Sequence, residues 1–151
     1  MIYNNIGFNF ENFIFEILKS TKGESYKEKD IRKKFRNITA IDHMLIYNNN
    51  ILCFQEKWKE TKPTLEDIHH FISCINLLKI NLKDFFFNYN YYGIYLSKKK
   101  FTDNAQISAN NYNIINIYDD TFEGIKKKLI DYLYDIHNIY LYDKDNDIFM
   151  R

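Results

Sequence analysis

The chain is short of the residues that interrupt or cross-link a fold: it has one proline, four glycines and two cysteines among 151 residues. So little Gly and Pro excludes collagen-like and linker-rich chains. It also argues against a glycine-rich loop around phosphates, so we expect no nucleotide cofactor. Lys and Arg number 21 against 20 Asp and Glu, and this near-neutral balance excludes a histone-like polycation or an acidic tail protein. The hydrophobic content of 46% predicts an ordered domain.

Cysteine placement and hydrophobic run length bear on the compartment. Cys53 and Cys74 both lie in apolar stretches, where small free thiols are typically buried. Polar residues interrupt the first stretch of the chain, which predicts no secretory signal, and no apolar run approaches the ~18 residues of a membrane span. We therefore expect an intracellular protein in a reducing compartment, with no membrane association; a single disulfide is the alternative.

The hydrophobic pattern alternates between helical and strand-like periods. Residues 1–142 form one expected domain, and the acidic residues 143–151 form an expected frayed tail. Three asparagines, residues 48–50, separate two apolar runs and predict a hairpin, because Asn tolerates turn conformations. The order predicts an α/β domain with helices on a central mixed sheet. The expected helices are 9–20, 64–80, 102–111 and 119–138, and the expected strands are 38–47, 51–58, 93–96 and 112–118.

The predicted hairpin carries an unusual set of polar residues. Alternation along a strand places Gln55 and Lys57 on one face and Glu56 on the other. Asp42 lies in the preceding apolar run, so strand pairing would bring it near Gln55 and Lys57. An Asp, a further oxygen ligand and a Lys in one place are suited to holding Mg²⁺ and a phosphate. A buried Asp–Lys ion pair beside a hairpin edge is the alternative interpretation.

A series of short motifs in a fixed order adds to this hypothesis. The segments are Gly7-Phe8-Asn9-Phe10-Glu11, Ala40-Ile41-Asp42, Phe54-Gln55-Glu56-Lys57, Gly93-Ile94-Tyr95-Leu96-Ser97 with Phe101-Thr102 and Ala105, and residues 114–119. In this order they resemble the Mrr-type restriction endonuclease family of the PD-(D/E)xK nuclease superfamily, with Ala40 where the family has Gly and with no clear companion DNA-recognition domain.

The resemblance implies a restriction-endonuclease-like core, with helices on both faces of the sheet, and an endonuclease that uses Mg²⁺, with Mn²⁺ as a substitute, to hydrolyse phosphodiester bonds in DNA. It implies that Asp42 binds the metal, that Gln55 offers its amide oxygen in place of a second carboxylate, and that the backbone carbonyl of Glu56 completes the protein ligands. Lys57 would orient the attacking water, and Glu11 would bind a second metal or a metal-bound water. The products would carry a 5′-phosphate and a 3′-hydroxyl.

Clusters of cations and aromatic residues raise the question of partners. Solvated surface and phosphate contact are both open interpretations of the basic residues. The aromatic run 85–92 either covers the sheet or forms the face of a homodimer. Two alternatives to an Mrr-like enzyme stay open: a Holliday-junction-resolvase-like nuclease, and an inactive DNA-binding or assembly protein of the same fold. The candidate DNA contacts are Lys33, Lys34, Arg36, Lys59, Lys98, Lys99 and Lys100.

Overall fold

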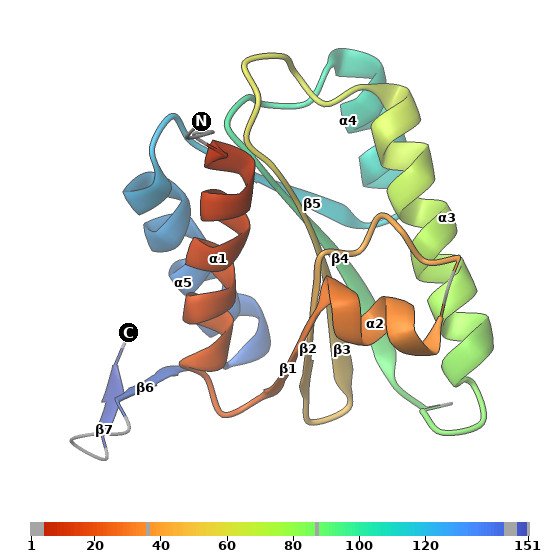
Figure 1. The fold of residues 1–151 in the computed structure, drawn as a ribbon, viewed down its shortest axis with the longest axis vertical. Helices are drawn as coiled ribbons and strands as arrows, with labels where there is room; N and C mark the ends of the chain where they lie inside the picture. The colour runs from red at the N-terminus through yellow and green to blue at the C-terminus, as the bar shows by residue number, and fades with distance from the viewer. Residues whose placement is uncertain (1–4, 36, 87, 144–147, 151) are drawn as a thin grey trace.

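A computed structural model describes residues 5–35, 37–86, 88–143 and 148–150 of the chain (Figure 1). The elements in chain order are α1 (Ile6–Lys19), β1 (Glu24–Lys27), α2 (Glu28–Lys34), β2 (His43–Tyr47), β3 (Asn50–Lys57), α3 (Leu65–Leu82), β4 (Asn90–Ser97), α4 (Asp103–Asn111), β5 (Ile114–Tyr118), α5 (Phe122–His137), β6 (Leu141–Asp143) and β7 (Ile148–Met150).

Five strands form one mixed sheet in the order β1-β2-β3-β4-β5. The first two pairings are antiparallel, with His43 opposite Phe54, and the last two are parallel, with Lys57 beside Ser97. Because β2 and β3 run in opposite directions, the start of β2 lies next to the end of β3. The carboxyl ends of the parallel strands β3 and β4 lie at this same edge.

Helices cover both faces of the sheet and bury a core on each (Figure 1). On one face, α1 and α5 pack over Leu45, Leu52 and Phe54. On the other, α2, α3 and α4 cover a second core that includes Cys53 and Tyr95. Neighbouring residues of β3 thus belong to opposite cores, as strand alternation requires. The expected α/β fold with a central mixed sheet and helices on both faces is confirmed.

Local sequence signals account for most of the element boundaries. The β2–β3 hairpin turns at Asn48, whose φ of 54° lies in the left-handed region that Asn tolerates. Thr64 starts α3 with a capping box to Asp67, and Thr102 and Thr121 cap α4 and α5.

Two segments differ from the sequence-based prediction. The expected helices and strands left residues 21–37 without an element, but this polar, basic segment contains β1 and α2. Ile31 is the one buried side chain of α2. Asp143 and Ile148–Met150, expected to be frayed, lie in the two-stranded β6–β7 sheet. The remaining residues of the predicted tail, 144–147 and 151, lie outside the described residues.

No described helix has the length and apolar character to cross a bilayer.

The burial of both cysteines agrees with the expectation from their apolar surroundings in the sequence. Cys53 and Cys74 are both free and buried, which confirms the expected thiols over the alternative of a disulfide. Burial raises the pKa of Cys53 to about 12, so the thiol stays protonated.

Glycine 93 is expected to be intolerant of a side chain. A Cβ at this position would lie 2.9 Å from Ile75 Cδ1 and 3.1 Å from Phe71 Cε2, and would also overlap Ile114. We expect Gly93→Ala to lower the free energy of unfolding in urea by about 1–3 kcal/mol, the usual cost of overpacking a core. At Gly7 in α1 a Cβ meets only Asn5 Oδ1 at 3.6 Å, so Gly7→Ala should be neutral or stabilising by up to about 1 kcal/mol. Equal effects of the two substitutions would contradict the packing described here.

Candidate active site

Asp42 lies at the edge where β2 begins and β3 ends. Asp42 is only 6% exposed, and its backbone N–H donates to the carbonyl oxygen of Phe54 at 2.8 Å. The backbone N–H of Glu56 in turn donates to Asp42 Oδ2 at 2.8 Å. These two hydrogen bonds tie Asp42 across the hairpin and fix its carboxylate beside the end of β3.

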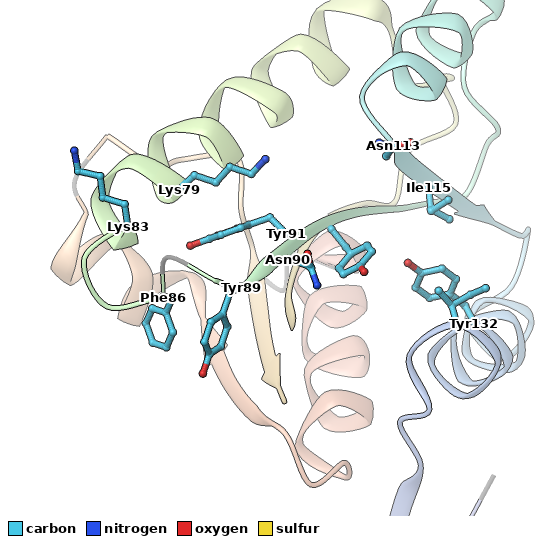
Figure 2. A pocket seen from close by; sticks show the side chains of 11 residues that line it. Lys79, Lys83, Phe86, Tyr89, Asn90, Tyr91, Asn113, Ile115 and Tyr132 are labelled. Atoms are coloured by element: carbon cyan, nitrogen blue, oxygen red, sulfur yellow. The ribbon is translucent and has the colours of Figure 1, made fainter. Parts of the chain in front are cut away.

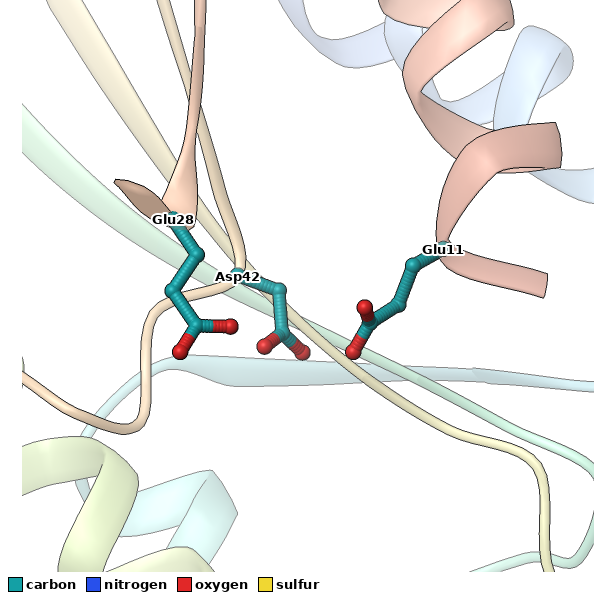
Figure 3. Close-up of side chains that lie close together, drawn as sticks. All are labelled: Glu11, Glu28 and Asp42. Atoms are coloured by element: carbon teal, nitrogen blue, oxygen red, sulfur yellow. The ribbon is translucent and has the colours of Figure 1, made fainter. Parts of the chain in front are cut away.

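Two further carboxylates converge on Asp42 from separate elements. Glu11 extends from α1, and Glu28 is the first residue of α2. Figure 3 shows the carboxylates of Glu11 and Glu28 on either side of that of Asp42. One oxygen from each of the three residues lies within 4.8 Å of the others, a spacing that would let one cation contact all three.

The register of the sheet explains the position of Glu28. Lys27, the last residue of β1, pairs with His43, the first residue of β2. Glu28, the residue after β1, and Asp42, the residue before β2, are therefore neighbours. Arg32, one turn further along α2, contacts Glu28 with Nη2 at 2.6 Å from Oε1 and holds its side chain in place.

Burial and like charge make ionised carboxylates unfavourable in this cluster. Burial, followed by the neighbouring carboxyl groups, raises the pKa of Asp42 to about 10, against the opposing effect of the Glu56 N–H. Burial and then the charge of Glu28 raise the pKa of Glu11. Without a cation the cluster therefore retains protons that exposed carboxyl groups would lose at neutral pH.

Gln55 packs directly against Asp42. One end of its amide lies 3.2 Å from Asp42 Oδ2 and also contacts the carbonyl oxygen of Ala40. Hydrogen bonding at that end requires the amide nitrogen, which donates to both oxygens. The sequence-based prediction that Gln55 offers its amide oxygen to a metal would therefore require the amide to turn when a cation binds.

The Glu56 side chain lies on the opposite face of β3 from Gln55, as strand alternation predicts. It is fully buried and forms a short hydrogen bond with Nδ1 of His43, whose ring stacks on Phe15 of α1 with centroids 5.1 Å apart. Burial raises the pKa of Glu56 well above its usual value and lowers that of His43 to about 4. Both directions favour an uncharged pair in which Glu56 donates its proton to His43.

Lys57 is the last residue of β3 and is partly exposed. Among the described residues its side chain has no hydrogen bond or ion pair, and alternation places it on the same face of β3 as Gln55. The alternative interpretation of a buried Asp42–Lys57 ion pair therefore does not describe this structure. The amine is left available to a substrate.

The predicted DNA contacts come from three places at the surface. Lys33 and Lys34 are exposed in the last turn of α2, Lys59 is exposed just after β3, and Arg36 lies outside the described residues. In the segment after β4, Lys98 pairs with Glu60, Lys99 lies 3.6 Å from Asp120, and Lys100 is exposed. Their role in binding DNA stays a prediction.

A hollow with a volume of about 750 Å³ lies away from the carboxylates. Aromatic side chains contribute five of its eleven lining residues, and Lys79 and Lys83 also line it (Figure 2). It adjoins Asn90, the first residue of β4, whereas Asp42 lies at the opposite end of the strands. Tyr89 and Tyr91, from the aromatic run considered as a dimer face, line this hollow.

Comparisons with known proteins place the fold. No family model and no curated protein matches the chain. A repair endonuclease from Pyrococcus abyssi has a TM-score of 0.50 and 20% identity, over 77% of this chain and 46% of that one. A protein of unknown function gives 0.49 and 11%, over 74% and 57%, and a complex of EndoMS with double-stranded DNA gives 0.48 and 15%, over 70% and 40%. The chain shares the restriction-endonuclease-like α/β fold of the repair endonuclease and spans about half the length of these proteins.

Sequence reasoning named Asp42, Glu11 and Gln55, and the structure places all three together. It did not name Glu28 as a site residue. Glu28 lies in a segment with eight cations and three acidic residues between positions 19 and 36, where a single acid has no distinguishing pattern. Only the pairing of β1 with β2 brings it to Asp42, and that pairing is not visible in local periodicity.

Proposed function

We propose that the chain is a metal-dependent DNA endonuclease of the Mrr-like kind. The observation that carries this proposal is the convergence of Glu11, Glu28 and Asp42 at the end of β3 (Figure 3). The restriction-endonuclease-like fold, shared with a repair endonuclease, supports it. The ordered motifs of the sequence support the narrower Mrr-like assignment.

The residues at this edge suit a hard divalent cation. Carboxylate and amide oxygens are the ligands that Mg²⁺ and Mn²⁺ prefer, and the cluster is acidic, with a buried Asp42 at its centre. Asp42 and Glu11 would hold Mg²⁺, together with the amide oxygen of Gln55 and the backbone carbonyl of Glu56. When bound, the cation supplies positive charge that stabilises negative charge on the phosphate undergoing hydrolysis.

The remaining steps fall to side chains of the chain itself. The Lys57 amine has no ion pair among the described residues and lies on the Gln55 face of β3, where it would orient the attacking water and stabilise the charge that develops on the phosphate. The Glu56 N–H keeps the Asp42 carboxylate in one orientation. Exposed lysines such as Lys59 and Lys100 would contact the DNA backbone, which requires positive charge and no sequence code.

The decisive test is cleavage of supercoiled plasmid and of linear and four-way-junction DNA with Mg²⁺, with Mn²⁺ and with EDTA. We expect cutting with either metal, no cutting in EDTA, and products with a 5′-phosphate and a 3′-hydroxyl. An Asp42→Ala/Lys57→Ala double variant purified in parallel reveals contaminating nucleases. Equal cutting by both preparations would refute the assignment. Junctions cut in preference to duplex would favour the resolvase-like alternative, and metal-independent DNA binding without cutting would favour an inactive binding protein.

A further inference from the structure

We propose that Glu28 supplies the negative charge that Gln55, as a neutral residue, cannot give to the metal site. This inference rests on the proposed function and specifies the composition of its site. It concerns a residue on α2, outside the hairpin that carries Asp42 and Gln55.

Gln55 contributes hydrogen bonds to the cluster and no charge. The donated hydrogen bonds from its amide nitrogen to Asp42 Oδ2 and to the Ala40 carbonyl stabilise the cation-free arrangement. If the amide turns to present its oxygen, it remains uncharged. Asp42 and Glu11 alone would therefore give a site with two negative charges, which is weak for a divalent cation because affinity rises with the number of charged oxygen ligands.

Glu28 is placed to provide the third charge. One of its oxygens belongs to the group that lies within 4.8 Å of oxygens of Glu11 and Asp42, and the three side chains come from different elements that meet at this point (Figure 3). The Arg32 contact at 2.6 Å restrains the Glu28 side chain, which reduces the entropy lost when a ligand fixes it.

A purely structural role explains less of this geometry. An acid in the first turn of a helix is favourable for the helix dipole, but Asp30 already occupies that turn and accepts from the Lys27 backbone N–H at 3.3 Å. The Glu28 carboxylate instead lies beside those of Glu11 and Asp42, with one oxygen of each residue within 4.8 Å of the others (Figure 3).

A second observation points to a cation at this edge of the sheet. Glu56 donates its backbone N–H to Asp42, and its own side-chain Oε2 atom is buried without a hydrogen-bond partner among the described residues. This edge of the sheet therefore holds more buried oxygen atoms than the hydrogen-bond donors of the described residues satisfy, a situation that native proteins usually resolve with an ion or water.

The test measures Mn²⁺ binding without DNA, by calorimetry and by electron paramagnetic resonance of free Mn²⁺. Glu28→Gln should weaken binding by about tenfold or more, because one charged ligand is lost. Adding Gln55→Glu to Glu28→Gln should restore the affinity close to that of wild type. Arg32→Gln is the matched control: it removes the ion pair but keeps the Glu28 carboxylate, so it should weaken Mn²⁺ binding far less than Glu28→Gln does. Circular dichroism verifies that each variant is folded.

The outcomes separate this inference from the proposed function. Wild-type affinity in Glu28→Gln, equal loss in Arg32→Gln, or no recovery in the double variant would each overturn the role of Glu28, while Mn²⁺ binding and DNA cleavage by the wild type would leave the nuclease proposal standing. A wild type that neither binds Mn²⁺ nor cuts DNA would overturn both.

Discussion

Asp42→Asn is expected to abolish metal-dependent DNA cleavage while making the cation-free protein less sensitive to pH. The loss of cleavage should reach about 10³-fold or more, because Asp42 is the most buried of the three clustered carboxylates and no other acid among the described residues occupies its position between Glu11 and Glu28. Asn keeps the size of the side chain and an oxygen that can accept from the Glu56 N–H, so the fold should persist.

The sign of the pH effect follows from the direction of the pKa shift. The pKa of Asp42 is raised to about 10 by burial and neighbouring carboxyl groups, whereas in the unfolded chain Asp titrates near pH 3.9. Between these values the folded state keeps a proton that the unfolded chain has lost. The free energy of unfolding therefore falls as the pH rises, by up to about 1.4 kcal/mol per pH unit for one proton. Asp42→Asn removes this contribution.

Urea unfolding in EDTA at pH 6 and pH 8.5 measures this effect. The wild type should lose more stability than Asp42→Asn across the interval, and Mg²⁺ added in place of EDTA should stabilise the wild type but not Asp42→Asn. Asp84→Asn, in the exposed turn after α3, is the control and should behave like wild type in each assay. An Asp42→Asn variant with the full pH dependence of the wild type would show that Asp42 does not carry the raised pKa.

The sequence predicted the parts of the site that depend on local patterns. The apolar runs on either side of Asn48–Asn50 predict the β2–β3 hairpin, and alternation within β3 separates Gln55 and Lys57 from Glu56, as observed. The motif ending at Glu11 placed an acid on the first helix. Each of these signals requires only a short stretch of sequence.

The missing parts depend on contacts between distant segments. β1 and α2 are short and charged, and their hydrophobic signal amounts to little more than Ile31 and Tyr26, so nothing in the local pattern separates them from a loop. The edge pairing of β1 with β2 then determines where Glu28 lies. The pairing of Glu56 with His43 was missed for a related reason: His43 lies in an apolar run, where its partner across the strand cannot be identified before the register is known.

Lys57→Met is expected to separate catalysis from metal binding. Lys57 lies on the same face of β3 as Gln55 and has no ion pair among the described residues, so its amine is proposed to act on water and phosphate. Met retains most of the length and apolar character of the side chain. Cleavage should fall by about 10²–10⁴-fold, the usual contribution of a positioned proton-transfer or charge-stabilising group, while Mn²⁺ should bind and stabilise the variant as it does the wild type.

The matched control is Lys62→Met, an exposed lysine in the segment between β3 and α3 that has no proposed role at the site. It should cleave DNA and bind Mn²⁺ like the wild type. This variant controls for the loss of one positive charge near the same edge of the sheet. A Lys57→Met variant that loses Mn²⁺ stabilisation together with cleavage would assign Lys57 to the architecture of the metal site. A Lys57→Met variant that cuts DNA like the wild type would show that hydrolysis does not need the Lys57 amine, and the proposed mechanism would fail.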